Sequence, residues 1–202
     1  IMPGETAMLA EVSEQTVWDV IGLYLQLGYT HILPKGLDHI LFVLALFFAS
    51  TRLKPLVWQI SAFTVAHTLT LGLATLGLVT LPGAIVEPII ALSIAFVAVE
   101  NLVFKDMTRW RPLIVFVFGL FHGLGFAGVL SELGLPAGQL VPALLSFNVG
   151  VELGQLTIVL ACWLALHRFR DATWYPWLVR IVSVGIALIA LWWTLERTVL
   201  AA

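Results

Sequence analysis

A carboxylate and two imidazoles lie close together immediately before a long apolar run near the start of the chain. They are His31, Asp38 and His39, and the apolar run begins with Ile-Leu-Phe42. Ionisable groups at the mouth of a membrane helix are costly unless something binds them. Carboxylate oxygen and neutral imidazole nitrogen together suit borderline divalent transition metals. The segment is therefore predicted to form the mouth of a metal site or pathway.

Other ionisable side chains lie inside later apolar runs. At about 1.5 Å of helix rise per residue, His67, His122 and Glu152 fall near the middle of the membrane, and Glu100 falls nearer one end. The aspartate–histidine pair of the first segment falls at the opposite end. Charged groups at mid-membrane cost at least a few kcal/mol and usually mark an ion or proton path inside a bundle. We therefore expect a column of ligands ordered by depth.

These residues also have structural interpretations. A single intramembrane histidine is more often a partner in a hydrogen bond between helices than a ligand. Asn148 and Gln155 share one helix face, and we expect both to form interhelical hydrogen bonds that support the site. Glu87 suits the start of a helix, where the dipole favours an anion. Glu100 could pair with Lys105 on the next turn.

The composition indicates the class of protein. The 202 residues are 60% hydrophobic and only 11% charged, whereas soluble domains carry about 25% charged residues. The chain is therefore predicted to be a polytopic membrane protein. Its net charge of −2 argues against nucleic acid as a partner. The one cysteine, Cys162, excludes a disulfide framework and a CxxC metal site.

Six apolar segments approach the length of about 20 residues that a membrane span needs. Proline, glycine or charged residues separate them, and they cover roughly residues 37–51, 57–79, 85–104, 112–130, 140–166 and 177–198. The first is the shortest. The predicted fold class is therefore all-α, a polytopic membrane helix bundle of about six transmembrane helices.

Two further patterns concern how the helices are arranged. Residues 16–33 have apolar residues at helical spacing with Asp19 and Gln26 off that face, which is typical of a helix at the membrane interface. We therefore divide the chain into an extracytoplasmic segment with an interfacial helix, residues 1–33, and a six-helix transmembrane domain, residues 34–202. Glycines that favour close helix packing lie near His122 and Glu152, namely Gly119, Gly123, Gly125, Gly150 and Gly154.

Basic residues are concentrated at alternate connections between the predicted spans. Eight of the ten lysines and arginines follow the first, third and fifth spans: Arg52, Lys54, Lys105, Arg109, Arg111, Arg168, Arg170 and Arg180. By the positive-inside rule these connections face the cytoplasm, so both termini are extracytoplasmic. A seventh span over residues 16–33 would force the acidic start of the chain inside, which disfavours it. The predicted location is a bacterial-type inner membrane.

Five motifs together resemble the HupE/UreJ family of membrane proteins. The resemblance runs from about His31 to Gln155 and is carried by Gly36-Leu-Asp-His39, Phe63-Thr-Val-Ala-His67, Val99-Glu-Asn101, Phe121-His-Gly-Leu-Gly-Phe-Ala127 and Phe147-Asn-Val-Gly-Val-Glu-Leu-Gly-Gln155. It implies a small six-helix permease associated with hydrogenase and urease maturation. Six residues separate His31 from Asp38, a longer spacing than in the shorter permeases. The predicted extracytoplasmic N-terminus favours the branch of the family with an extracytoplasmic N-terminal region.

The resemblance implies that a divalent ion passes into the cytoplasm, nickel foremost, with cobalt, copper or zinc as alternatives. The family's signature of a histidine and an aspartate–histidine pair corresponds to His31, Asp38 and His39. In this hypothesis the ion sheds water there, passes the three midplane residues and leaves past Glu100. The membrane potential favours cation import by about 2.3 kcal/mol per charge per 100 mV. The partners are then the metal ion and the lipid bilayer, and assembly into an oligomer stays open.

Two other classes of protein are compatible with histidines inside a membrane. An intramembrane zinc-dependent hydrolase would use histidines and a carboxylate to hold zinc and an activated water. It would bind zinc tightly and hydrolyse lipid or amide bonds without transport. A haem-carrying bundle would use His67 and His122 as axial ligands and show a Soret band. We favour the permease and expect no enzymatic activity, with the hydrolase as the alternative.

Overall fold

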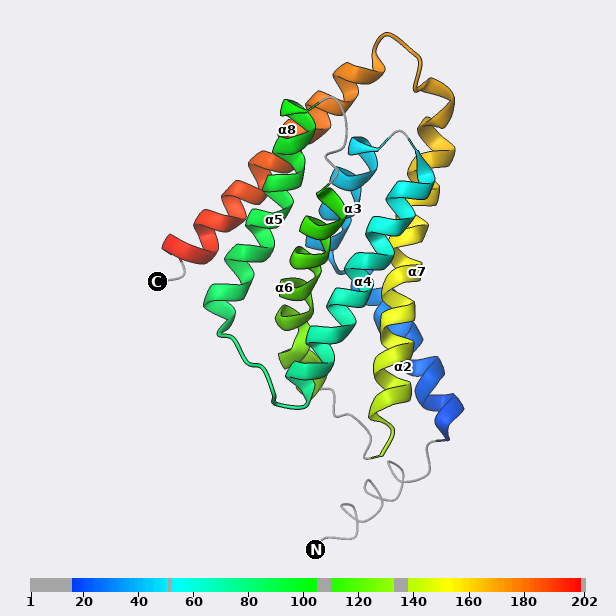
Figure 1. The fold of residues 1–202 in the computed structure, drawn as a ribbon, viewed down its shortest axis with the longest axis vertical. Helices are drawn as coiled ribbons and strands as arrows, with labels where there is room; N and C mark the ends of the chain where they lie inside the picture. Colours follow the sequence, from blue (N-terminus) through cyan, green and yellow to red (C-terminus); the bar gives the residue numbers. More distant parts are fainter. Residues whose placement is uncertain (1–15, 51, 105–109, 133–137, 201–202) are drawn as a thin grey trace, which may run out of the picture.

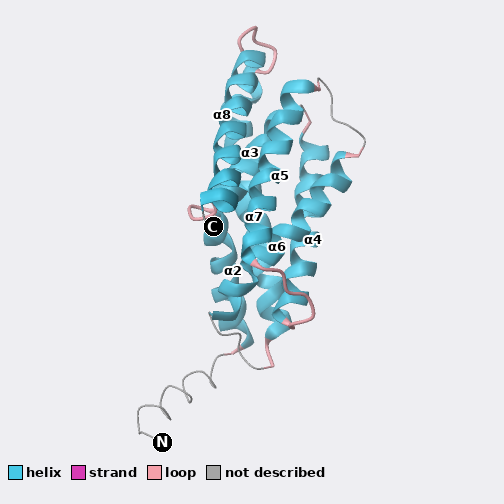
Figure 2. Cartoon of the chain, turned by 90° about the vertical axis from the view of Figure 1, so that its left-hand side faces the viewer, coloured by secondary structure: helices cyan, strands magenta, loops and turns pink. Residues whose placement is uncertain are grey.

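The chain forms a bundle of helices. The computed structural model describes residues 16–50, 52–104, 110–132 and 138–200, without the side chains of 127–132. This part of the chain contains seven α-helices and no strand, which confirms the predicted all-α membrane bundle (Figures 1 and 2). The helices are α2 (Val17–Ile32), α3 (Leu37–Ala49), α4 (Leu53–Thr75), α5 (Gly83–Val103), α6 (Arg111–Glu132), α7 (Leu140–Leu166) and α8 (Tyr175–Leu195).

Most of these helices are long and apolar enough to cross a membrane. Four meet that requirement by themselves: α4, α5, α7 with the short helical turn η1 (His167–Phe169), and α8 with the π-helical segment η2 (Glu196–Leu200). Helices α2 and α3 meet it only as a pair, bent by 69°. Helix α6 is apolar over the shorter stretch Arg111–Phe126. The first predicted span is short because α3 is only half of this bent pair.

The helices alternate in direction along the bundle. The ends of α3, α5 and α7 and the starts of α4, α6 and α8 gather at one end of the molecule, at the top of Figure 1. Six of the eight grouped basic residues are described and belong to this end, whereas Lys105 and Arg109 lie outside the described residues. When α2 and α3 are counted as one crossing, the start of α2 and the end of α8 both lie away from this basic end (Figure 1).

Glycines allow the backbones of neighbouring helices to approach closely. A Cβ at Gly28 of α2 would overlap the main-chain oxygen of Phe147, and one at Gly150 of α7 would overlap that of Leu25. The same relation joins α6 to α4, where a Cβ at Gly123 would overlap the main-chain oxygen of His67. Helix α2 therefore packs along α7, and α6 packs along α4.

A break of four residues, 33–36, separates α2 from α3. The main chain stays hydrogen-bonded across it, because the N–H of Gly36 donates to the carbonyl of Ile32 over 3.1 Å. A Cβ at Gly36 would overlap the main-chain oxygen of His31, so the turn requires glycine at this position. The break brings the end of α2 and the first turn of α3 together. The domain boundary predicted at residue 33 falls within it, and residues 1–15 lie outside the described residues.

Candidate metal centre

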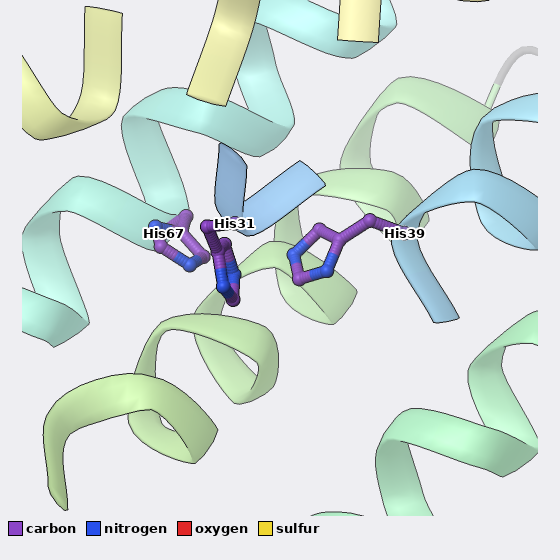
Figure 3. A group of neighbouring side chains, drawn as sticks. All are labelled: His31, His39 and His67. Atoms are coloured by element: carbon purple, nitrogen blue, oxygen red, sulfur yellow. The ribbon is translucent and has the colours of Figure 1, made fainter. Parts of the chain in front are cut away.

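Three histidines from three helices converge at the break. His31 ends α2, His39 lies in the first turn of α3, and His67 lies in the middle of α4 (Figure 3). One donor atom from each lies within 4.8 Å of the other two. The ring centroids of His31 and His39 are 4.8 Å apart, and those of His39 and His67 are 6.0 Å apart. Three imidazole donors this close together have the composition of a transition-metal site and could converge on one ion.

A fourth histidine borders this group from α6. The ring centroid of His122 is 5.0 Å from that of His39. His39, His67 and His122 are at most 3% exposed, and His31 is half-buried. The Nε2 atoms of all four histidines are buried and have no hydrogen-bond partner among the described residues. We call His31, His39, His67 and His122 the histidine cluster.

Hydrogen bonds at Nδ1 fix the tautomers of two members of the cluster. Nδ1–H of His67 donates to Oδ1 of Asn148 over 2.9 Å, and the Asn148 amide nitrogen donates to the Leu144 carbonyl, which orients the amide. Nδ1–H of His122 donates to the carbonyl of Phe118 over 2.9 Å. Because a neutral imidazole carries one N–H, the Nε2 atom of each ring keeps its lone pair. This is the form in which histidine binds metals.

A carboxylate supports the third member of the cluster. Oδ1 of Asp38 accepts the main-chain N–H of His39 over 2.9 Å and lies 3.2 Å from Nδ1 of the same histidine. The Asp38 side chain is 27% exposed, so its carboxylate also faces solvent-accessible space. A carboxylate behind an imidazole orients the ring and increases its basicity as a ligand.

The cluster opens into a cavity of about 200 Å³. Two charged residues line this cavity in addition to the histidine and aspartate ligand candidates: Glu87 near the start of α5 and Arg197 in η2. The Arg197 guanidinium donates to the main-chain oxygen of Glu87 over 3.2 Å. Sequence reasoning assigned Glu87 only to a helix start and did not single out Arg197. The predicted position of Glu87 at the same outer end as Asp38 was the available signal for the glutamate.

Aromatic rings form the other walls of the cluster. The Phe126 ring centroid is 4.0 Å from that of His31, and the Phe63 centroid is 4.9 Å from that of His122. Sequence reasoning did not predict these contacts, although both phenylalanines occur within the histidine motifs. Rings in these places exclude water and strengthen electrostatic interactions inside the site.

The predicted separation of His39 from His67 and His122 by depth is wrong. His39 was placed at the outer end of its span and His67 and His122 at the midplane, yet the three rings are neighbours. The physical reason is the bend: α2 supplies one half of the crossing, so α3 begins inside the bundle. The four histidines among the ligand candidates therefore form one cluster.

Glu152 does not join the histidine cluster. Its carboxylate accepts a hydrogen bond from the Ser61 hydroxyl over 2.6 Å. It lines a groove of about 430 Å³ between α4 and α7, together with Thr64, Thr68, Asn148 and apolar residues. Gln155 accepts from the Thr64 hydroxyl over 3.3 Å, so this face of α7 is joined to α4 by polar contacts.

Glu100 lies near the basic end of the bundle, away from the cluster. Its carboxylate is 3.5 Å from Nε of Arg111, and Nη2 of Arg111 donates to Oδ1 of Asn101 over 3.0 Å. The alternative partner Lys105 lies outside the described residues. Arg111 is 3% exposed and Glu100 is 7% exposed, so this is a buried ion pair at the junction of α5 and α6.

The fold and the cluster define a class: a polytopic membrane protein with an intramembrane site of metal-ligand composition. A family model described as HupE / UreJ protein matches residues 7–197. The chain therefore belongs to the HupE/UreJ family, whose members are transport proteins that handle transition-metal ions. The comparisons with curated proteins and with solved structures found no match.

Proposed function

We propose that this protein is a permease that carries a divalent transition-metal ion, nickel foremost, into the cytoplasm across a bacterial-type inner membrane. The observation that carries the proposal is the set of four buried Nε2 atoms without hydrogen-bond partners among the described residues. Leaving a buried polar group unsatisfied costs about 1–3 kcal/mol. Four such groups in one cluster, three of them on residues that line the same cavity, are accounted for if a cation binds there during transport.

The donor set suits the proposed cargo. His31, His39 and His67 supply the central ligands, His122 borders them, and Asp38 adds a carboxylate at the cavity. Neutral imidazole with carboxylate oxygen is a ligand mixture for nickel, cobalt, copper and zinc. Glu152 and Glu100 lie outside the cluster, and we do not assign them as ligands of the bound ion.

The cavity suggests where the ion gains access. It extends from the cluster to Glu87 and Arg197, near the start of α5 and the end of α8. Both elements lie away from the basic end of the bundle, which the positive-inside rule assigns to the cytoplasm. An ion that enters beside Glu87 therefore reaches the histidines from the extracytoplasmic side. For a dication, the membrane potential contributes about 4.6 kcal/mol per 100 mV to inward movement.

Nickel accumulation in cells that express single variants tests this proposal. His39→Ala should reduce uptake to the background of cells without the protein, because the His39 ring lies beside all three other members of the cluster. His167→Ala is the matched control, since this histidine lies outside the cluster and bonds the Trp163 carbonyl. It should transport like the unmodified protein at equal amounts in the membrane.

Two outcomes would contradict the permease. The first is unchanged accumulation of nickel, cobalt, copper and zinc in His39→Ala. The second is stoichiometric, tightly held zinc in the purified protein, together with hydrolysis of lipid or amide bonds and no uptake. The second outcome would support the intramembrane hydrolase, in which the metal stays bound as a Lewis acid.

A further inference from the structure

A second cavity lies at the basic end of the bundle. It has a volume of about 480 Å³ and is lined on its polar side by Glu100, Asn101, Arg111, Arg170, Tyr175 and Arg180. Glu100 lies thirteen positions along α5 after Glu87 at the metal cavity, which corresponds to about 20 Å of helix. This second cavity is therefore remote from the histidine cluster.

The lining of this cavity is positively charged. Among the described residues that line it, three guanidinium groups and one carboxylate give a net formal charge of +2. The single carboxylate, Glu100, is 3.5 Å from Nε of Arg111. The described part of the lining therefore holds two more guanidinium groups than carboxylates. Such a cavity favours an anionic ligand.

The three guanidinium groups are held in place by neighbouring side chains. Arg111 donates to Asn101 over 3.0 Å. The guanidinium carbon of Arg170 lies 5.7 Å from the Phe47 ring centroid, and that of Arg180 lies 5.4 Å from the Trp177 centroid. A planar guanidinium offers a fork of donors that matches the oxygens of a phosphate. Because these side chains are already oriented, a phosphate would bind with a smaller loss of side-chain entropy.

The same cavity has an apolar side that faces out of the bundle. Leu102, Val103 and Phe104 at the end of α5 line it and are 39%, 65% and 55% exposed. Large apolar side chains that are exposed at the end of a membrane span contact acyl chains. The cavity therefore combines a cationic recess with an open apolar flank, which fits a ligand with an anionic head and hydrocarbon tails.

We propose that this cavity binds the phosphate of an anionic phospholipid in the leaflet at the basic end, which is the cytoplasmic leaflet under the positive-inside rule. Basic pockets between transmembrane helices on that side bind anionic head groups in other membrane proteins. In this proposal the positive charges of Arg170 and Arg180 attract the phosphate, and the end of α5 contacts the acyl chains. Lipid binding at this site does not depend on metal transport.

Native mass spectrometry of the purified full chain in detergent tests the site. The protein is titrated with phosphatidylglycerol or with phosphatidylcholine of the same acyl chains, and bound lipids are counted. Phosphatidylglycerol should bind more tightly, and Arg170→Gln combined with Arg180→Gln should weaken it by about five-fold per arginine. Arg168→Gln is the matched control, because Arg168 is exposed and does not line the cavity. Its affinity should stay unchanged.

A single variant and a change of ionic strength separate loss of the lipid site from poor folding. Arg180→Gln alone changes an exposed side chain, so it reports on binding even if the double variant is poorly folded. Its expected loss is about five-fold, reduced at high ionic strength because salt screens the interaction. Equal binding of both lipids, or an equal loss in Arg168→Gln, would overturn the proposal. Displacement of phosphatidylglycerol by millimolar inorganic phosphate would overturn the assignment to a lipid and leave a site for soluble anions.

Discussion

At the scale of single residues, the hydrogen-bond acceptors at Nδ1 of the imidazoles determine which ring nitrogen can bind a metal. His67 donates through Nδ1 to Asn148, and His122 donates through Nδ1 to the Phe118 carbonyl. Each bond directs an Nε2 lone pair away from the acceptor. Asn148 is therefore a positioning residue, because it acts on a metal only through His67.

Replacing Asn148 by leucine should weaken metal binding about 10–100-fold, the usual cost of losing such an outer partner. Asn148→Asp should retain most of the affinity, because it keeps an oxygen acceptor. Isothermal titration of the purified protein with nickel measures both. Gln155→Leu is the matched control, since Gln155 lies on the same helix and bonds Thr64 instead of a histidine. Equal weakening in the control would show that the effect is general to this helix face.

The sequence identified the histidines and Asp38 but not how they meet. Counting residues from a span end assumes a straight helix, and the bend between α2 and α3 violates that assumption. The same limit applies to Glu152, which is four residues from Asn148. That offset moves it about 6 Å along the helix, so it bonds Ser61 whereas Asn148, which lines the same groove, bonds His67.

At the scale of helices, the contact between α2 and α7 fixes His31 in the cluster. Gly28 lies three residues before His31 and meets the main-chain oxygen of Phe147. The glycines on α7 were predicted to favour close helix packing near Glu152, and a Cβ at Gly154 would lie 2.8 Å from a side-chain atom of Ile32 in α2. The sequence indicated that α7 packs closely against another helix, but it did not identify that helix. Small residues show where a neighbouring backbone can approach, and they do not show which backbone does so.

Gly28→Ala should therefore destabilise the protein by about 1–3 kcal/mol, as overpacking does in other tightly packed interiors. The added methyl group forces α2 away from α7 and moves His31 from its neighbours, so nickel affinity should fall as well. Thermal unfolding and nickel titration of the purified protein measure the two effects. Gly22→Ala is the control on the same helix, because a Cβ there meets nothing within 4 Å. Comparable losses in both variants would contradict a role for the close approach.

At the scale of the whole molecule, charge is distributed unevenly between the two ends. Eight of the ten basic residues group near one end by sequence, and Arg197 is one of the two exceptions. It lines the same cavity as the histidine cluster and bonds the main-chain oxygen of Glu87 instead of its carboxylate. Its guanidinium also lies 5.4 Å from the Trp193 ring centroid. A fixed positive charge on the proposed access route opposes a dication, whereas Glu87 attracts one.

Arg197→Gln should therefore lower the KM for nickel uptake by about five-fold, and Glu87→Gln should raise it by a similar factor, because local charge sets the concentration of ions at a cavity mouth. The maximal rate should change little in either variant, since neither residue belongs to the histidine cluster. Initial rates of nickel uptake over a range of concentrations separate the two parameters. Both effects should shrink as ionic strength rises.

Two further variants distinguish local charge from general damage to the end of α8. Arg197→Lys keeps the charge and should leave KM near its original value. Glu196→Gln changes the charge of an exposed neighbour that does not line the cavity, so it should have a smaller effect than Glu87→Gln. If Arg197→Lys lowers KM as much as Arg197→Gln, the guanidinium acts through its shape and contacts with Trp193, and not through repulsion of the cation. A raised KM in Arg197→Gln would instead mean that the arginine holds the residues at the cavity entrance in the arrangement that binds nickel.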